Sequence, residues 1–258
     1  MKISNRLQAL YAAVSPGESV ADIGTDHGYV PLMLLRDGIS DRVILADISS
    51  GSLAKAIDNF EEAGISLPSS CFRIGDGLEP ILPGEVDDVI IAGMGGQLIQ
   101  MILDEDIEKT RSYRKLILQP RNNSGELRCY LYAKGCRIQQ EILAGEGKFV
   151  CEIIVAAPGP SAPGESCVEA GQEDRITPYG EHDIRWKYPE AFVTCDAALL
   201  AQRIDWRANR ILEQIHSLEQ SKTDQVERIQ SLRADRQYIL DLKERNRRYH
   251  ERTETGNH

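Results

Sequence analysis

Residues 19–158 alternate short apolar runs with segments whose apolar residues recur at helical spacing. Runs rich in valine and isoleucine are typical of parallel strands that are buried on both faces. We predict strands at 19–24, 42–48, 71–76, 87–93, 115–120, 136–143 and 149–158, and helices at 30–36, 53–63, 97–103 and 125–133. This order predicts an α/β fold, in which helices cover both faces of a mostly parallel, seven-stranded sheet.

The last two predicted strands are separated only by residues 144–148. Two parallel strands need a crossover of a dozen or more residues between them, whereas antiparallel neighbours need only a short turn. We therefore predict that the last strand is antiparallel and belongs to a hairpin at one edge of the otherwise parallel sheet.

The C-terminal part of the chain has a different pattern. Residues 158–180 are rich in Pro, Gly, Ser and acidic residues, which is typical of a linker or surface loop. Farther on, apolar residues recur mostly three, four or seven positions apart, and a polar break follows at 220–225, where Thr223 or Asp224 could cap a new helix. We predict an α/β domain at 1–158, a linker at 159–188, a coiled-coil-like helical hairpin at 189–250 and a flexible tail at 251–258.

Composition limits the class of protein. The 258 residues are 41% apolar and 27% charged, as in a folded globular protein. We expect a cytoplasmic protein that does not engage a membrane, because no apolar run is long enough to cross one and no signal peptide is evident. Residues 1–195 carry 18 Lys and Arg against 29 Asp and Glu, which argues against general nucleic-acid binding. The six cysteines and five histidines show no metal-ligand spacing, so we expect no metal.

The stretch "DIGTDHGYVP" at residues 22–31 follows the first predicted strand. Gly24 permits a tight turn and a close approach of backbone to ligand, and Gly28 opens the next helix. Asp47 ends the second strand, where an acidic side chain can accept hydrogen bonds from ribose hydroxyls. The pattern predicts a cofactor that contains adenosine, either NAD or S-adenosylmethionine. A strand–helix turn without a ligand is the alternative.

Three features favour S-adenosylmethionine over NAD. Asp26 takes the place of a glycine in the dinucleotide pattern, and its carboxylate would repel a pyrophosphate but attract a sulfonium. Asp76 follows the third strand, where it could meet the amino group of adenine. The third feature is the antiparallel final hairpin.

With these residues the chain resembles the class I, Rossmann-like S-adenosylmethionine methyltransferases. Within that class it is similar to the bacterial tRNA (adenine-N1) methyltransferases that act on adenine 22. The blocks that carry the resemblance are "ISNRLQAL", "ADIGTDHGYVP", "IAGMGGQLI" and "LILQPRNNSGELR". The resemblance implies S-adenosyl-L-methionine as cofactor and tRNA, not DNA, as partner. The cofactor contacts that it implies are Asp22, Gly24, Asp47, Ile48, Asp76, Gly77, Gly93, Met94 and Gly95.

The predicted chemistry needs little acid–base catalysis. Adenine N1 has a free lone pair, so its methylation is a direct displacement that depends chiefly on alignment and leaves a cationic ring. Asp26 can face the sulfonium or that ring, and His27 can contact the base or orient Asp26. Alternatively, Asp26 caps the following helix and His27 packs against it. The predicted contacts with the substrate are Tyr29, Gly96, Gln119, Pro120 and Arg121. Tyr29 could instead pack in the core, and "GMGG" could be only a turn.

RNA affinity should come largely from phosphate contacts. Candidates are Lys2, Arg6, Arg121, Arg128, Arg137, Arg203, Arg207 and Arg210. Trp186 and Trp206 could stack on RNA, although Trp206 is favoured to fasten the helical hairpin instead.

Three other functions stay open. The first is a methyltransferase of this fold that acts on a small molecule or protein, with the helical tail serving dimerisation. The second is a NAD-dependent oxidoreductase, and the third is a partner-binding module without catalysis. The sequence leaves the oligomeric state open, with a monomer slightly favoured.

Overall fold

The computed structural model describes residues 3–159, 178–220 and 225–255. In this part of the chain seven strands form one sheet, in the order β3-β2-β1-β4-β5-β7-β6. The strands are β1 (Val20–Ile23), β2 (Val43–Asp47), β3 (Phe72–Ile74), β4 (Asp88–Met94), β5 (Lys115–Pro120), β6 (Arg137–Glu146) and β7 (Phe149–Ala157). Each lies within about three residues of its predicted place.

The directions of the strands confirm the predicted topology. Strands β1 to β5 are parallel, with Val20 opposite Val43 on one side of β1 and opposite Asp88 on the other. Strand β7 is antiparallel both to β5 and to β6, with Ile117 opposite Val155. Strand β7 therefore lies between β5 and β6, so that β6 forms the edge of the sheet.

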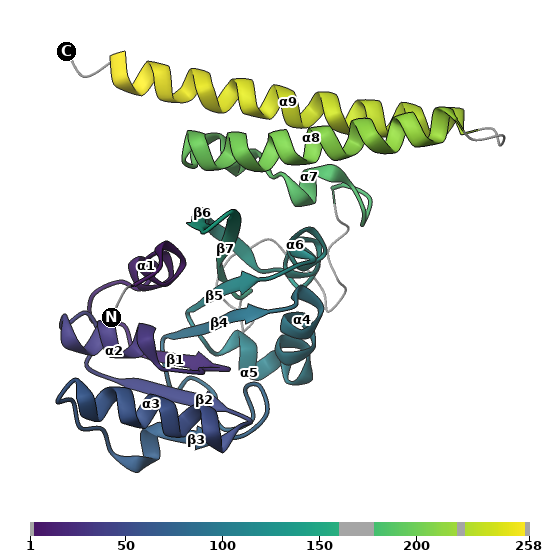
Figure 1. Ribbon diagram of the computed structural model, residues 1–258. Helices are drawn as coiled ribbons and strands as arrows, with labels where there is room; N and C mark the ends of the chain where they lie inside the picture. Colours follow the sequence, from purple (N-terminus) through teal and green to yellow (C-terminus); the bar gives the residue numbers. More distant parts are fainter. Residues whose placement is uncertain (1–2, 160–177, 221–224, 256–258) are drawn as a thin grey trace.

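Helices cover both faces of the sheet, because its central strands are apolar on both sides (Figure 1). On one face, α1 (Asn5–Ala12), α2 (Tyr29–Arg36) and α3 (Ser50–Glu62) pack through buried residues such as Leu34 and Phe60. On the other face lie α4 (Gly96–Glu105), α5 (Ile107–Arg111) and α6 (Ser124–Ala133), which contribute Ile99 and Leu127 to a second core. Gly64 and Gly135 follow α3 and α6 with positive φ angles, a conformation that glycine commonly adopts just after a helix.

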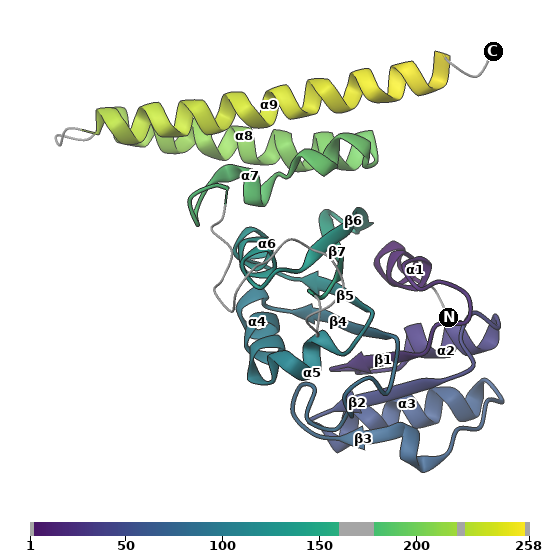
Figure 2. The same cartoon turned by 180° about the vertical axis from the view of Figure 1, so that it is seen from behind.

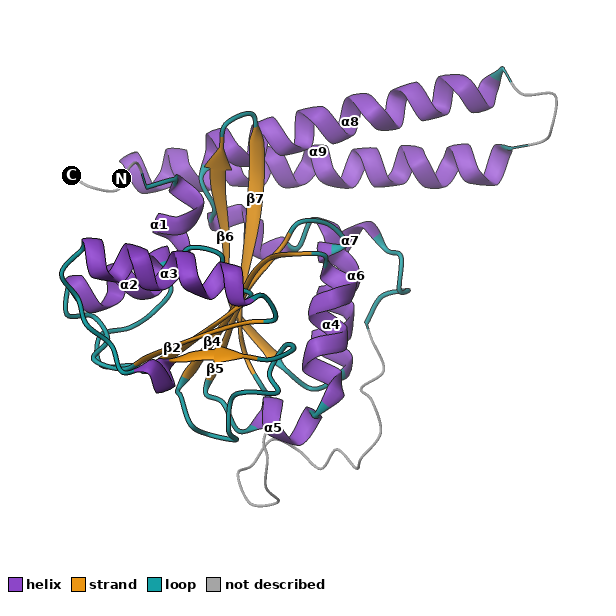
Figure 3. Ribbon diagram, turned by 60° about the horizontal axis from the view of Figure 1, so that its bottom comes forward, coloured by secondary structure: helices purple, strands orange, loops and turns teal. Residues whose placement is uncertain are grey.

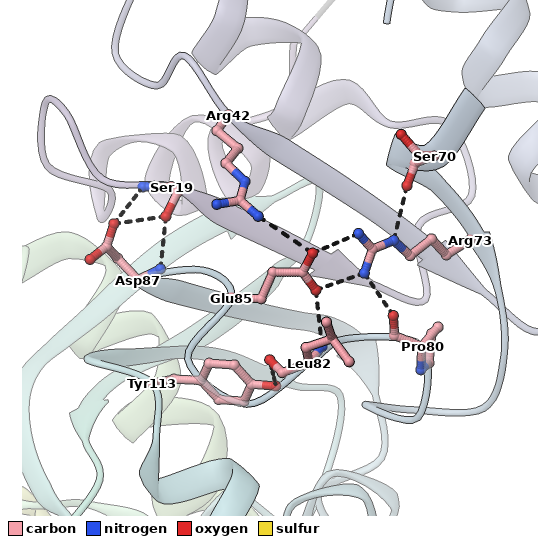
Figure 4. A network of polar contacts seen from close by, with 9 residues as sticks. All are labelled: Ser19, Arg42, Ser70, Arg73, Pro80, Leu82, Glu85, Asp87 and Tyr113. Atoms are coloured by element: carbon pink, nitrogen blue, oxygen red, sulfur yellow. Dashed lines mark hydrogen bonds and ion pairs between the residues drawn. The ribbon is translucent and has the colours of Figure 1, made fainter. Parts of the chain in front are cut away.

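A polar network fixes the long connection between β3 and β4 (Figure 4). The Arg73 guanidinium donates to both Glu85 carboxylate oxygens at 2.7 Å and to the Pro80 carbonyl at 2.8 Å. The bonds from Arg73, together with a bond from the Leu82 amide, lower the pKa of Glu85 to about 2. Tyr113, which lies just before β5, donates from its hydroxyl to the Leu82 carbonyl. The connection that carries Asp76 is thereby held against the sheet.

The C-terminal part is helical, as predicted (Figure 2). Helix α7 (Ile184–Lys187) and the 3₁₀ helix η2 (Glu190–Thr194) precede α8 (Ala197–Glu219) and α9 (Val226–Thr255). Helices α8 and α9 pack together through a core that includes Ile204, Ile211, Ile239 and Leu242. None of the described helices combines the length and the apolar composition that crossing a bilayer requires.

The last helix extends past the end of the predicted hairpin at residue 250. Helix α9 continues to Thr255, so residues 251–255 of the predicted tail are helical. The helix extends because Arg247 pairs with Glu251 one turn later, and the Thr253 hydroxyl donates to the His250 carbonyl. The predicted caps Thr223 and Asp224 lie outside the described residues, as do residues 160–177 of the predicted linker.

Candidate active site at the carboxyl ends of the strands

The predicted site residues lie at one edge of the sheet, because strands β1 to β5 are parallel and end together. Asp47 at the end of β2 is level with Ile74 at the end of β3, and Met94 at the end of β4 is level with Pro120. Strand order reverses between β1 and β4, which is where open α/β sheets bind their ligands. Figure 3 shows this edge with the loops that surround it.

The turn after β1 is fixed by its own hydrogen bonds. The amides of Gly24 and Thr25 both donate to the Ala46 carbonyl, at 2.8 and 3.3 Å, which ties the turn to β2. The Thr25 hydroxyl accepts from the Gly28 amide at 3.1 Å. Gly28 has φ 65°, and a Cβ there would strike Leu45. Glycine is therefore needed at position 28 for helix α2 to pack closely on the sheet.

Gly24 lies under the Met94 side chain. A Cβ at Gly24 would overlap the methyl group of Met94, and φ at Gly24 is 73°. Only glycine combines this backbone conformation with such a close approach. The first turn and the "GMGG" loop, which are far apart in the sequence, therefore meet at the switch point of the sheet.

Asp26 and His27 are together at the mouth of this turn. One Asp26 oxygen accepts from the Lys55 ammonium at 2.7 Å, and the other lies 3.1 Å from His27 Nε2. The bond from Lys55 lowers the pKa of the Asp26 carboxyl, which is 58% exposed. The His27 ring stacks on Tyr29, with ring centroids 5.1 Å apart. His27 therefore contacts Asp26, as one of its predicted roles requires.

The alternative in which Asp26 caps helix α2 is wrong. Gly28 is the N-cap of α2 and makes no side-chain capping bond. The Asp26 carboxylate points instead to α3, where it accepts from Lys55. The side-chain amide of Asn59, in the same helix, donates to the His27 carbonyl at 2.9 Å and so also holds the turn. Asp26 thus presents an ionised carboxylate to solvent at the edge where a ligand would bind.

Asp22 and Asp47 add two more carboxylates. Asp22 is buried at the end of β1, and burial, with a further contribution from Asp47, raises its pKa to about 6. Asp47 is half-buried and accepts from the Ser49 amide at 2.7 Å. The edge of the sheet therefore gathers negative charge, which suits a ligand that carries positive charge.

An exposed apolar area lies beyond Asp47. Ile48 is 71% exposed and Ile74 is 64% exposed, at the ends of the neighbouring strands β2 and β3. Asp76 and Gly77 follow at once, and Gly77 has φ 49° and packs against Ile102 of α4. Apolar surface flanked by a carboxylate can take a flat ring that has an amino group at its edge.

The "GMGG" loop is held by the end of β5. Gln119 is buried, its Oε1 accepts from the Gly93 amide at 3.1 Å, and its Nε2 donates to the Pro120 carbonyl. The Arg121 amide donates to the Met94 carbonyl at 2.7 Å, while the Arg121 side chain is exposed. Both polar ends of Gln119 are thus used within the protein, and its contact with a base stays a prediction.

Two residues that contribute to this geometry were not selected from the sequence. Asn122 accepts from the Gly96 amide through its carbonyl at 3.1 Å and its side-chain oxygen at 3.2 Å. Lys55 pairs with Asp26 from a helix far along the chain. The repeated asparagine in "PRNN" was an available signal, because Asn123 adopts φ 51° and asparagine tolerates that conformation. Lys55 had no comparable signal.

The structure contradicts two of the predicted phosphate contacts. Arg128 is fully buried and pairs with Glu141 and Glu152. Arg203 is mostly buried and pairs with the same Glu152. Each looked like a surface cation because its acidic partner lies on a different element. The other arginines proposed for RNA lie wholly or partly at the surface, namely Arg6, Arg121, Arg137, Arg207 and Arg210, whereas Lys2 is outside the described residues.

The structure contradicts the prediction that Trp186 stacks on RNA and the prediction that Trp206 fastens the hairpin, whereas stacking of Trp206 on RNA stays a prediction. Trp186 is buried and donates from Nε1 to the Gly180 carbonyl, so it cannot stack on RNA. Trp206 is 66% exposed and does not fasten the helical hairpin. It falls between Ile204 and Ala208, which are buried on the opposite face of α8.

Comparison with known proteins identifies the catalytic part of the chain. The family model for a methyltransferase domain matches residues 3–154. The chain belongs to this family. In the described part of the methyltransferase domain and the helices after it, no group of three or more His, Cys, Asp or Glu residues could hold a metal ion.

A relative of the methyltransferase domain is the tRNA (adenine(22)-N(1))-methyltransferase of Bacillus subtilis (strain 168). It is 35% identical over 159 residues, which are 62% of this chain and 66% of the relative. The chain spans 60% to 66% of the length of the curated relatives that it matches.

Two solved structures resemble both the methyltransferase domain and the helices that follow. One is a candidate tRNA (m1A22) methyltransferase of Streptococcus pneumoniae in complex with S-adenosyl-L-methionine. It has a TM-score of 0.72 and 25% identity, over 94% of this chain and 100% of that chain. The other is the m1A22 tRNA methyltransferase TrmK of B. subtilis, with a TM-score of 0.64 and 27% identity over 96% and 98% of the two chains.

Proposed function

We propose that this chain transfers a methyl group from S-adenosyl-L-methionine to N1 of adenine 22 in tRNA. The observation that carries the proposal is the gathering of Asp22, Asp26 and Asp47 around the glycine turn at the switch point of the sheet. Both the cofactor and an N1-methylated adenine are cations, so a negative edge suits each of them. The matched m1A22 methyltransferases support the choice of substrate.

The residues of this edge fit the cofactor. Gly24 lets the backbone turn tightly at the switch point, Asp47 can accept hydrogen bonds from ribose hydroxyls, and exposed Ile48 can cover one face of the adenine. Asp76 can accept from the adenine amino group, and Asp22 can attract the ammonium group of the amino acid end. Backbone groups of Gly77, Gly93, Met94 and Gly95 complete the proposed cofactor site.

S-adenosyl-L-methionine supplies an electrophilic methyl group on a cationic sulfur. Adenine N1 has a lone pair and no proton to lose, so the protein needs no strong base and contributes mainly by alignment. The carboxylate of Asp26 stabilises positive charge as it moves onto the adenine ring. His27 holds that carboxylate by its contact at 3.1 Å.

The base must leave its stack or pair before N1 can react, at a cost of a few kcal/mol. The stacked rings of His27 and Tyr29 provide an aromatic surface at the mouth of the turn. The backbone at Gly96 and the rigid Pro120 flank the position of the base. Phosphate contacts then fall to exposed arginines such as Arg121 and Arg137, in the cytoplasm where tRNA is modified.

The proposal is tested with unmodified tRNA transcripts and S-adenosyl-L-methionine labelled in its methyl group. We expect label in 1-methyladenosine, and none when adenine 22 is replaced by guanine in the same transcript. If the protein binds the cofactor but methylates no tRNA, the proposal is wrong, and a small-molecule or protein substrate is favoured.

A further inference from the structure

Four buried charges join the sheet to the helical part of the chain. Arg128 of α6 donates to Glu141 of β6 at 2.7 and 2.8 Å and to Glu152 of β7 at 2.7 Å. Arg203 of α8 pairs with the other oxygen of Glu152. The Arg128 guanidinium also donates to the Trp186 carbonyl of α7 at 3.1 Å. Two positive and two negative charges thus balance one another away from water, as buried ions require.

Glu152 also holds the first residue of helix α6. The Ser124 hydroxyl donates at 3.0 Å to the Glu152 oxygen that pairs with Arg203. Packing strengthens this link, because a Cβ at Gly125 would lie 2.6 Å from the side chain of Lys187 in α7. The helical part therefore contacts the start of α6 both through an ion pair and through close packing.

The residues just before α6 hold the "GMGG" loop. The Gly96 amide donates to the Asn122 carbonyl and side chain. A Cβ at Gly96 would lie 2.7 Å from the Asn123 carbonyl oxygen. With so little free space, a movement of the start of α6 must move Gly96 as well.

We propose that the helical part of the chain positions the Gly93–Gly96 loop through Arg203, Glu152 and Ser124. The inference rests on the proposed function, because that loop is where cofactor and base are expected to meet. Ser124 and Arg203 are positioning residues, since neither lies at the strand edge. Without Arg203, Glu152 keeps Arg128 as its cationic partner among the described residues, and the oxygen that accepts from Ser124 loses its counter-charge.

Two variants test the two ends of this connection. Ser124→Ala removes the hydroxyl but keeps every charge, and Arg203→Met removes the charge but keeps the length of the side chain. The matched control is Arg233→Met, which breaks the exposed ion pair between Arg233 and Glu219 inside the helical hairpin. Each full-length protein is measured by NMR at the Gly96 amide, by thermal unfolding, and by steady-state kinetics with tRNA.

We expect both variants to shift the Gly96 amide resonance and to lower kcat about fivefold to tenfold, because small misplacements slow an aligned displacement. KM for tRNA should stay within about twofold, since neither residue is placed in RNA binding. Arg233→Met should leave kcat and the resonance unchanged. If Arg203→Met does not fold, Ser124→Ala decides.

A lower unfolding temperature with an unmoved Gly96 resonance and unchanged kcat would overturn the proposal and leave the ion network a purely stabilising role. If the unaltered protein methylates no tRNA, the proposed function fails. The Gly96 resonance still reports on the connection in that case, so the two failures are distinguishable.

Discussion

The Lys55 ammonium donates a hydrogen bond of 2.7 Å to Asp26, and so joins helix α3 to the turn after β1. This bond is the main reason that the pKa of Asp26 lies below its ordinary value. The second Asp26 oxygen faces His27, and more than half of the Asp26 side chain is exposed to solvent. A carboxylate held in this way stays ionised while it approaches a ligand.

The first prediction concerns the charge of Asp26. Asp26→Asn should lower kcat by about tenfold, because an amide cannot balance positive charge on the ring, and partial exposure weakens the effect. Affinity for S-adenosyl-L-methionine should change little, since Asp22 and Asp47 are untouched. Rapid-quench kinetics and calorimetry measure the two quantities. Turnover equal to that of the unaltered protein would exclude Asp26 from the chemistry.

The second prediction concerns Lys55. Lys55→Met removes the bond that favours the ionised carboxylate, so the pKa of Asp26 should rise toward its ordinary value of about 3.9. Carbon-13 NMR of the Asp26 carboxyl during an acid titration measures this shift. The control is Lys243→Met, which breaks an exposed ion pair of 2.6 Å with Asp205 far from the sheet edge. Equal Asp26 titrations in both variants would contradict the assignment.

The third prediction concerns Asp22, whose pKa burial raises to about 6. Above that pH the carboxylate is ionised and attracts the ammonium group at the amino acid end of the cofactor, whereas below it the neutral acid does not. Affinity for S-adenosyl-L-methionine should therefore fall as the pH drops from 7 to 5. Calorimetry across this range measures the effect, and Asp22→Asn should remove most of it. A pH dependence that survives in Asp22→Asn must arise elsewhere.

The fourth prediction separates backbone strain from ligand contact. Gly24→Ala places a methyl group against Met94 and should weaken cofactor binding about tenfold or more, because the turn must open to admit it. Gly38→Ala is the matched control, since Gly38 has φ 67° with nothing within 4 Å of its added Cβ. Both variants should lose stability, but only Gly24→Ala should lose affinity. A comparable loss of affinity in the control would point to general destabilisation.

The order of strands and helices could be predicted because local patterns determine it. Apolar runs mark strands β1 to β5, and the short gap at residues 144–148 leaves only an antiparallel pairing for β7. The position of Asp47 and Gly24 at one edge then follows from parallel topology, without knowledge of any side-chain contact.

The contacts across elements could not be predicted in the same way. Arg128 and Glu152 lie 24 positions apart, and nothing near either residue indicates that the two are buried together. Lys55 likewise meets Asp26 only because α3 packs beside the first turn. Trp206 and Ile204 differ in exposure because the two lie on opposite faces of α8, a difference that depends on where the neighbouring helix packs.

The fifth prediction concerns the stability of the buried ion network. Arg128→Met leaves Glu141 and Glu152 buried near each other, and should lower the free energy of unfolding by about 3–5 kcal/mol at pH 7. Burial alone raises the pKa of Glu152, but Arg203 and Arg128 outweigh it and bring the pKa below its ordinary value. The loss of Arg128 reverses part of that balance, so Glu152 should take up a proton more readily in the variant.

The difference in stability between Arg128→Met and the unaltered protein should therefore shrink as the pH falls from 7 to 5. A lowered pKa gives its full stabilisation above the pKa of the unfolded chain, which is 4.5 for an ordinary glutamate, so Glu152 leaves the stability of the unaltered protein unchanged between pH 7 and pH 5. In the variant the pKa of Glu152 is higher, so Glu152 takes up a proton as the pH falls from 7 to 5. This protonation removes the buried unpaired charge and so reduces the loss of folding free energy. Urea unfolding at both pH values measures the difference, with Arg233→Met expected to cost less than about 1 kcal/mol at either pH. A deficit in Arg128→Met that stays constant from pH 7 to pH 5 would mean that Glu152 does not carry the unpaired charge.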